Sequence, residues 1–370
     1  MNDPNGLICH RGVFHLYYQH NPFGIQFGNI SWGHATSRDL KTWTHQPVAL
    51  QAYDQTMIYS GCVIFDQNNL LQQPNTSLAA IYTEHVGDEK DYRERICLAT
   101  SADGGMTFDQ QHRQVILEHT DPDFRDPKVF FHGKTDRWIM VVARPKQYTI
   151  CLYSSEDLIH WTHESDFTAE APHTQYWECP DLYPLTDDNG ITHWVLSMSG
   201  SNYDQQTWGM FYFIGTFDGH HFRTKRTYQW LDHGRDFYAG ITFEGYVKDR
   251  IMMAWCNNWL TANQPHGGNW SGIMSSPRIL RLYKGQVVHE FVTEINPKTW
   301  HLSDPQEVMI QLTQITLVVS RHMIQLLQPD NGWMDERRFP FEIKTLQCYE
   351  DTGLLELLIN EGVSATWQLL

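Results

Sequence analysis

Four turns of one kind recur along the chain and constrain its fold more than any other feature. In each of them an acidic segment leads to an aromatic residue: SRDLKTW, SADGGMTF, SEDLIHW and TFDGHHF end at Trp43, Phe108, Trp161 and Phe222. The turns lie roughly 53 to 65 residues apart, a spacing typical of radial repeats that leaves room for about four strands in each. We therefore expect a β-propeller, although single turns of this kind also occur by chance in other β proteins.

The segments between the turns indicate an all-β fold. Short runs rich in Val, Ile, Phe, Tyr and Trp, such as VFHLYYQ and RWIMVVARP, are separated by Gly, Asp and Asn, and no long stretch keeps the period of an amphipathic helix. Residues 228–292 can supply a fifth blade without the turn signature, and the pattern changes at 294–297. The sequence therefore predicts a five-bladed β-propeller over residues 1–293 and a small second β unit over residues 294–370.

Charge, aromatic content and cysteine content limit the classes of partner and cofactor that the chain is expected to bind. The formal net charge of −16 would repel nucleic acid and anionic membrane surfaces, so we expect a neutral or cationic partner. The 14 Trp residues suit the flat apolar faces of sugar rings. The seven cysteines are spread singly, which indicates neither a disulfide framework nor a zinc site, and we expect no metal and no cofactor. Because no basic segment followed by an apolar one opens the chain, we expect a cytoplasmic location.

Three acidic residues share one local pattern. Asp3 and Asp126 each precede a proline, and Glu178 precedes Cys-Pro. Because proline donates no backbone hydrogen bond and favours extended geometry in the residue before it, each acid is expected at the entrance of a strand. The innermost strands of a propeller line its central channel, so the three carboxylates are expected to meet at one mouth. Asp121 and Asp304 also precede proline, and the pattern by itself therefore fits ordinary turns as well.

Acids that meet in this way suit the hydrolysis of a glycosidic bond. This reaction needs one carboxylate at the anomeric carbon and a second, protonated one that donates its proton to the leaving oxygen. A third carboxylate nearby would raise the proton affinity of the other two and could bind sugar hydroxyls. The order Asp3-Pro4-Asn5-Gly6 is also that of a type I β-turn, and such a turn would present Asp3.

Longer motifs around these acids resemble those of glycoside hydrolase family 32, which holds invertases, levanases and exo-inulinases. In chain order the motifs are MNDPNGL, WGHATSRDL, YSG, FRDP, ECPDL, DFYAG and RILRL. The resemblance implies a five-bladed propeller followed by a β-sandwich. It also implies that Asp3 is the nucleophile that forms a fructosyl-enzyme ester and that Glu178 is the acid and later the base. Asp126 would bind fructose hydroxyls and stabilise the transition state.

The resemblance further implies a pocket for a terminal fructose. The residues that it places at this pocket are Asn2, Gln19, Phe27, Tyr59, Ser60, Arg125 and Asp236. Candidates for its apolar walls, and equally for the core of a blade, are Trp32, Trp255 and Trp259. Arg125 precedes Asp126 and is expected to keep that acid ionised, because a neighbouring cation favours the charged form.

The chain departs from the family pattern at both ends. Family members have further residues before the Met-Asn-Asp-Pro motif, whereas Met1 here begins it, so we expect a chain shortened at the N-terminus. The nucleophile would then lie near a free amino terminus, where chains commonly fray. About 77 residues follow position 293, fewer than the family's sandwich has, and one sheet of that sandwich is expected to be incomplete with an exposed edge.

The substrate that the motifs favour is a fructan. The segment AWCNNWLTANQPHGGNWSGIMSSPR resembles that of levanases and exo-inulinases, and no cluster of Lys or Arg that would bind a phosphate stands near the motifs apart from Arg125. We therefore expect a retaining enzyme that releases terminal fructose from levan or inulin, and from sucrose as well. The alternatives are a sucrose or sucrose 6-phosphate hydrolase, a fructan-binding propeller without catalysis, and an inverting hydrolase of arabinosides or xylosides. The oligomeric state is left open.

Overall fold

The chain folds almost entirely into strands. The computed structural model describes residues 1–72, 78–88, 90–171, 176–202, 207–262, 270–292, 295–302, 308–328 and 333–369. Within these residues the one helix is the short 3₁₀ turn η1 (Pro145–Gln147), and all strands pair in antiparallel sheets. The prediction of an all-β fold is confirmed. No helix of the described residues is long and apolar enough to cross a membrane.

Five sheets follow one another along residues 4–291, each with its strands hydrogen-bonded in chain order. The first contains β1 (Pro4–His10), β2 (Val13–His20), β3 (Ser31–Ser37) and β4 (Thr44–Leu50). The second contains β5 (Thr56–Phe65), β6 (Leu78–Gly87), β7 (Tyr92–Ser101) and β8 (Gln114–Glu118). The third contains β9 (Arg125–His132), β10 (Arg137–Arg144), β11 (Thr149–Ser155) and β12 (Thr162–Phe167).

The fourth and fifth sheets complete this series. The fourth contains β13 (Tyr176–Thr186), β14 (Thr192–Asn202), β15 (Thr207–Phe217) and β16 (Phe222–Arg223), and β15 also pairs with β17 (Gln229–Trp230). The fifth contains β18 (Tyr238–Thr242), β19 (Arg250–Trp255), β20 (Arg278–Tyr283) and β21 (Gln286–Phe291).

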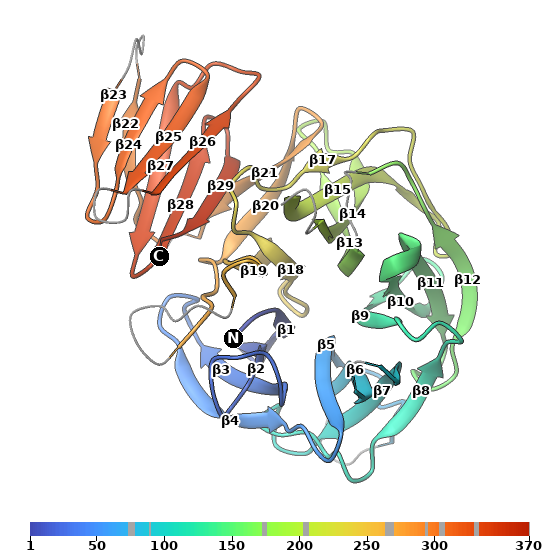
Figure 1. Cartoon of the computed structure of the whole chain (residues 1–370). Coiled ribbons are helices and arrows are strands. Elements are labelled where there is room, and N and C mark those ends of the chain that lie inside the picture. Colours follow the sequence, from blue (N-terminus) through green and yellow to red (C-terminus); the bar gives the residue numbers. More distant parts are fainter. Residues whose placement is uncertain are drawn as a thin grey trace.

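The first strand of each of these sheets faces a common axis. Strand β1 contacts β5 and β18, β5 contacts β9, and β9 contacts β13, which contacts β18 in turn. These five inner strands therefore form a closed ring, and Figure 1 shows the later strands of each sheet farther from the centre. Apolar side chains fill the space between neighbouring sheets; Trp138 and Ile81, for example, belong to one core shared by the second and third sheets.

The recurring acidic turns occupy one place in this architecture. Each joins the third strand of a sheet to its fourth: β3 to β4, β7 to β8, β11 to β12 and β15 to β16. In three of them a Ser hydroxyl binds an Asp carboxylate two residues later, and the pairs are Ser37–Asp39, Ser101–Asp103 and Ser155–Asp157. The fifth sheet lacks the signature because Lys284 and Gly285 alone connect β20 to β21.

Each inner strand is irregular near its start. The pairing register shifts between Asn5 and Ile8 in β1, and at the corresponding places in β5, β9, β13 and β18. Asp126, Cys179 and Ala239 lie in three of these irregularities with left-handed φ angles of 65°, 50° and 55°. Bulges of this kind bend a strand and redirect its side chains, and they are common beside active sites.

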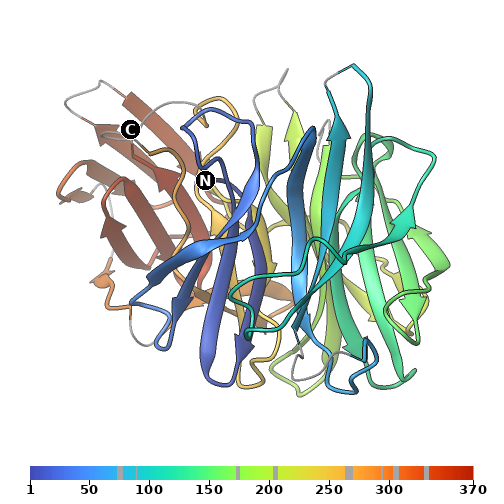
Figure 2. The same ribbon diagram turned by 90° about the horizontal axis from the view of Figure 1, so that it is seen from below.

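The strands between residues 298 and 368 form a unit beside the ring, here called the C-terminal module. One of its sheets has the order β22 (Lys298–His301), β27 (Thr345–Asp351), β28 (Leu354–Ile359) and β29 (Val363–Gln368). The other has the order β23 (Val308–Gln311), β24 (Thr316–Ser320), β25 (Met323–Gln328) and β26 (Trp333–Arg338). The two sheets share one apolar core. Figure 2 shows the module against the side of the molecule where the chain begins. The expected boundary at residues 293–294 lies outside the described residues.

Candidate active site

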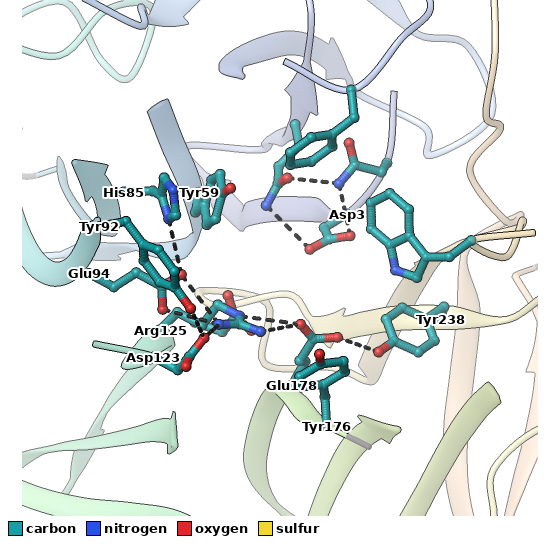
Figure 3. A pocket seen from close by; sticks show the side chains of 15 residues that line it. Asp3, Tyr59, His85, Tyr92, Glu94, Asp123, Arg125, Tyr176, Glu178 and Tyr238 are labelled. Atoms are coloured by element: carbon teal, nitrogen blue, oxygen red, sulfur yellow. Dashed lines mark hydrogen bonds and ion pairs between the residues drawn. The ribbon is translucent and has the colours of Figure 1, made fainter. Parts of the chain in front are cut away.

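A pocket of about 430 Å³ opens where the inner strands begin. Asn2 and Asp3 precede β1, and the other four inner strands bring Tyr59, Arg125, Asp126, Tyr176, Glu178 and Tyr238. The remaining lining residues are Gln19, Phe27, His85, Tyr92, Glu94, Asp123 and Trp259. The three acids that share the proline pattern, Asp3, Asp126 and Glu178, all line this pocket. Figure 3 shows Asp3 and Glu178 within it.

Asp3 is fixed by both its backbone and its carboxylate. Its carbonyl oxygen accepts a 3.0 Å hydrogen bond from the Gln19 amide. The carboxylate accepts hydrogen bonds from Ser60 Oγ at 2.6 Å, Asn2 Nδ2 at 3.2 Å and Gln19 Nε2 at 3.3 Å. Burial raises the pKa of Asp3, the Ser60 hydrogen bond opposes this, and repulsion by Glu178 adds to it. Asp3 is therefore bound to Gln19 of β2 and Ser60 of β5 as well as to its neighbour Asn2.

Asp126 points into the pocket from a strained backbone. Its left-handed φ of 65° is unusual for a residue with a side chain. The Asp126 amide donates a 3.0 Å hydrogen bond to the Thr83 hydroxyl. The Asp126 Oδ2 atom accepts a 2.9 Å hydrogen bond from the Cys179 amide. Burial, reinforced by repulsion from Glu178 and Asp3, raises the pKa of Asp126 to about 8 although Arg125 acts in the opposite direction. The expectation that Arg125 keeps Asp126 ionised is therefore wrong.

Arg125 instead binds three other carboxylates. Its Nη2 and Nε donate to Glu178 Oε1 at 2.7 and 3.2 Å. Its Nη1 donates to Glu94 Oε2 at 3.1 Å and to Asp123 Oδ1 at 3.3 Å. Three carboxylates around one guanidinium fix the direction of its planar fork, because Glu178 binds the Nε and Nη2 side while Glu94 and Asp123 bind Nη1. Arg125 therefore links the wall that carries Glu178 to the wall that carries Glu94.

Glu178 has a second donor on its other oxygen. The Tyr238 hydroxyl donates to Glu178 Oε2 at 2.5 Å. The two donors lie on different inner strands, β9 and β18, on either side of β13. Figure 3 shows Arg125 and Tyr238 on opposite sides of the Glu178 carboxylate, which faces the part of the pocket that contains Asp3.

The Cys179 thiol lies between the other two acids. Its Sγ is 3.6 Å from Asp3 Oδ2 and 3.5 Å from Asp126 Oδ2. Burial and the neighbouring carboxylates raise the pKa of this thiol well above its usual value, so it remains a neutral donor. The sequence pattern did not single out this contact, because it depends on the left-handed φ of 50° at Cys179.

One side of the pocket is aromatic. The ring centroids of Tyr59 and His85 are 4.7 Å apart, and those of His85 and Tyr92 are 4.8 Å apart, in two stacked pairs. The Tyr92 hydroxyl donates to Asp123 at 2.8 Å, and Lys146 pairs with the same carboxylate at 2.8 Å. His85, Tyr92, Glu94 and Asp123 were not anticipated from the sequence. They come from the β6–β7 hairpin and the segment before β9, whose positions follow from the sheet twist and not from a local motif.

Four of the predicted site residues do not line the pocket. Ser60 lies behind Asp3, to which it donates. Trp32 is fully buried and donates its Nε1 to the Tyr59 carbonyl at 3.0 Å, so it supports a lining residue from behind. Trp255 is 1% exposed and packs edge-on against Trp259, at 5.1 Å between ring centroids. Asp236 is fully buried, and other groups of the chain bind its carboxylate.

A metal ion would need several ligands in one place. Among the described residues, no group of three or more His, Cys, Asp or Glu side chains is arranged to hold such an ion.

Comparisons with known proteins identify the family. The N-terminal domain of glycosyl hydrolases family 32 matches residues 1–290. A levanase of Bacillus subtilis is 37% identical over 296 residues, which cover 76% of this chain and 43% of the levanase. An extracellular exo-inulinase of Aspergillus niger is 34% identical over 360 residues, which cover 87% of this chain and 65% of the exo-inulinase. The chain thus spans 43% to 65% of the length of these relatives.

The fold also has solved counterparts. A fructofuranosidase variant from Schwanniomyces occidentalis, complexed with fructosylnystose, superposes on the whole chain with a TM-score of 0.87 and covers 89% of its own length. The two sequences are 24% identical, so this likeness concerns the fold alone. The family match extends over nearly the whole ring of sheets and includes the three acids of the pocket. The chain therefore belongs to glycosyl hydrolases family 32.

Proposed function

We propose that this protein is a retaining glycosidase that releases terminal fructose from fructans and from sucrose. The observation that carries the proposal is the meeting of Asp3, Asp126 and Glu178 in one pocket. Figure 3 shows Asp3 and Glu178 on facing sides of it, so a sugar between them would meet one carboxyl at each face of its anomeric carbon. Such a pair is what double displacement needs.

Asp3 serves as the nucleophile in this proposal. Its carboxylate oxygen forms a bond to the anomeric carbon of fructose while the bond to the leaving oxygen breaks, which gives a fructosyl ester. The hydrogen bonds from Ser60, Asn2 and Gln19 support the role, because they hold the carboxylate in place and favour its charged form.

Glu178 serves as the acid and then as the base. Its proton passes to the leaving oxygen in the first step; in the second it takes a proton from water, whose oxygen attacks the anomeric carbon and releases Asp3. Arg125 and Tyr238 each donate to one oxygen of Glu178 and thereby fix the orientation of its carboxyl group. Asp126, whose pKa burial raises to about 8, carries a proton at neutral pH and can donate it in a hydrogen bond to a fructose hydroxyl.

The substrate class in this proposal is a neutral sugar. Among the described lining residues Arg125 is the one cation with a fixed charge, and Glu178, Glu94 and Asp123 already bind it. A phosphate would therefore meet carboxylates and no unpaired cation, which disfavours sucrose 6-phosphate. The aromatic stack of Tyr59, His85 and Tyr92 offers flat faces for the leaving sugar. The names of the levanase and the exo-inulinase agree with a fructan.

We further infer that the ring of five sheets is a five-bladed propeller and the C-terminal module a β-sandwich. The closed cycle of contacts among β1, β5, β9, β13 and β18 supports the first inference. The two four-stranded sheets of the module, with a shared core, support the second. The proposed domains are residues 1–293 and 294–370.

Fructose release tests the proposed function. The purified chain is incubated with levan, inulin, sucrose and sucrose 6-phosphate, beside Glu178→Gln and the matched surface control Glu156→Gln, whose carboxylate pairs with Arg137 away from the pocket. We expect release from the three neutral substrates by the chain and the control, and a loss of at least about a hundredfold in Glu178→Gln.

Three outcomes would favour the other functions. Fructan binding in calorimetry without any release would indicate a binding propeller. Preference for sucrose 6-phosphate would contradict the neutral substrate class. Retention is read from the anomer of fructose seen first by nuclear magnetic resonance, and inversion at that carbon would contradict double displacement.

A further inference from the structure

The segment 232–236 precedes β18 in the sequence. In space it lies alongside β29, the last strand of the C-terminal module. The amides of Arg235 and Asp236 donate to the Thr366 carbonyl at 3.0 and 3.1 Å, and the His233 amide donates to the Ser364 carbonyl at 2.8 Å. At Gly234 any Cβ would collide with the Thr366 backbone. This part of the ring is therefore in backbone contact with β29, a strand more than 120 residues farther along the chain.

Side chains strengthen the same contact. Asp232, 4% exposed, accepts hydrogen bonds from Ser364 Oγ at 2.5 Å, Thr366 Oγ1 at 2.8 Å and the Thr366 amide at 2.9 Å. Arg278 of β20 is fully buried and donates to Ser364 Oγ at 2.5 Å and to Thr366 Oγ1 at 3.2 Å. Buried hydrogen bonds to charged groups are costly to break, so β29 is held firmly at this point.

Asp236 connects β29 with the segments that carry two of the lining residues of the pocket. Its Oδ2 accepts a 2.8 Å hydrogen bond from the Gln368 amide, and its Oδ1 accepts one of 2.5 Å from Asn258 Nδ2. Asn258 directly precedes Trp259, which lines the pocket. Two residues after Asp236, Tyr238 donates to Glu178. One buried carboxylate thus joins the module to the segments that carry Tyr238 and Trp259.

We propose that Asp236 is a positioning residue through which the C-terminal module fixes Tyr238 and Trp259 and, through Tyr238, the direction of Glu178. This inference rests on the proposed function and gives Asp236 a role other than sugar contact. The carboxylate is fully buried, does not line the pocket and has both oxygens bound within the chain. Small displacements of a catalytic group lower the rate strongly, so a loosened Asp236 would act on turnover and not on binding.

Two variants test the connection. Asp236→Asn has nearly the same shape but cannot accept hydrogen bonds on both sides of its side chain. Thr366→Val keeps its shape and removes the hydroxyl that binds Asp232, on the module side of the contact. The matched control is Ile324→Val, which removes one methyl group from the module core.

The first measurement is hydrogen–deuterium exchange in peptides that contain residues 238–242 and 255–260. It reads local opening without any need for activity. We expect exchange in both peptides to rise at least about tenfold in Asp236→Asn and Thr366→Val and to stay unchanged in Ile324→Val. Unchanged exchange in both test variants would overturn the inference, whether or not the chain releases fructose.

The second measurement is a double-mutant cycle on sucrose. In the parent chain we expect Asp236→Asn to lower kcat about tenfold with little change in KM. In a Tyr238→Phe background we expect the same substitution to lower kcat less than about twofold, because the two residues act through one contact. Additive losses with a raised KM would identify Asp236 as a sugar ligand and overturn the inference. An inactive parent chain would contradict the proposed function instead, and the exchange data would then decide on the positioning role.

Discussion

Arg125 and Glu178, 53 residues apart in sequence, form a two-donor contact in which Nη2 and Nε both reach Oε1, at 2.7 and 3.2 Å. The contact spans two neighbouring inner strands, β9 and β13. It sets the direction of the carboxyl that the proposed mechanism uses as the acid. Arg125 also favours the charged form of Asp126, but the burial of that carboxyl outweighs this effect.

Replacing Arg125 with Lys is expected to lower kcat about a hundredfold. A lysine keeps the charge but has no fork, so it cannot bind Glu178 twice while it also binds Glu94. The matched control is Arg95→Lys, because Arg95 binds Glu84 through two nitrogens at 3.0 and 2.8 Å outside the pocket. Steady-state kinetics on inulin would check this, and an equal loss in both variants would contradict it.

The raised pKa of Asp126 makes a prediction about stability. Its folded pKa of about 8 exceeds the ordinary value of 3.8, so the folded state binds the proton more tightly than the unfolded chain between these pH values. The group therefore destabilises the fold increasingly as pH rises through this window. Asp126→Asn removes the effect, and we expect its free energy of unfolding to gain about 3 to 4 kcal/mol on the parent between pH 5 and pH 8.

Urea denaturation at several pH values measures this difference. The exposed Asp54→Asn serves as the control, whose curve should run parallel to that of the parent. A curve for Asp126→Asn that also runs parallel would show that Asp126 is ionised in the folded protein.

A buried histidine pair is expected to change the stability with pH in the opposite direction. His15 Nδ1 and His34 Nε2 are 3.1 Å apart, and burial lowers the pKa of His15 to about 4 and that of His34 to about 3. His10 acts in the same direction on His15, and Asp103 opposes the shift at His34. Below the ordinary value of 6.5 the unfolded chain binds more protons, so stability falls as pH falls from about 6.5 toward 4.

His34→Gln is expected to reduce this loss. Between pH 7 and pH 5 its free energy of unfolding should fall by about 1 to 2 kcal/mol less than that of the parent. The surface variant His160→Gln is the control and should follow the parent. Equal slopes for His34→Gln and the parent would mean that the pair is protonated in the folded state.

The aromatic side of the pocket makes a prediction about binding. His85 stacks between Tyr59 and Tyr92, so His85→Ala removes the middle of the stack. If these faces hold the leaving sugar, KM for sucrose and inulin should rise about fivefold to tenfold while kcat changes less, since a stacking contact is worth about 1 kcal/mol. A fall in kcat with an unchanged KM would place the leaving sugar elsewhere.

Local sequence patterns predicted the parts of this molecule that depend on neighbouring residues. Proline after Asp3 and Asp126 indicated strand entrances, and both residues lie there. The acidic turns ending at Trp43, Phe108 and Trp161 marked repeats because the Ser and Asp that cap each turn are two residues apart.

Contacts between distant strands could not be read in this way. The neighbours of Asp236 include Gln368, 132 residues away, and no local pattern links the two. Glu94 and Tyr92 reach the pocket because β6 and β7 extend to the mouth of the ring, which depends on strand length and twist. The pKa of Asp126 is raised because burial, together with repulsion from Glu178 and Asp3, outweighs the opposing effect of the adjacent Arg125.

The most direct test of the account is to trap the ester on Asp3. The Glu178→Gln variant is incubated with fructosyl fluoride, whose leaving group needs no acid, and its peptides are weighed by mass spectrometry. Without the base, the second step should be slow and the ester should accumulate. We predict the mass of one fructosyl group on the peptide that contains Asp3, and its absence in Asp3→Asn. Fructose release without any adduct on that peptide, or an adduct on another acid, would contradict the proposed mechanism.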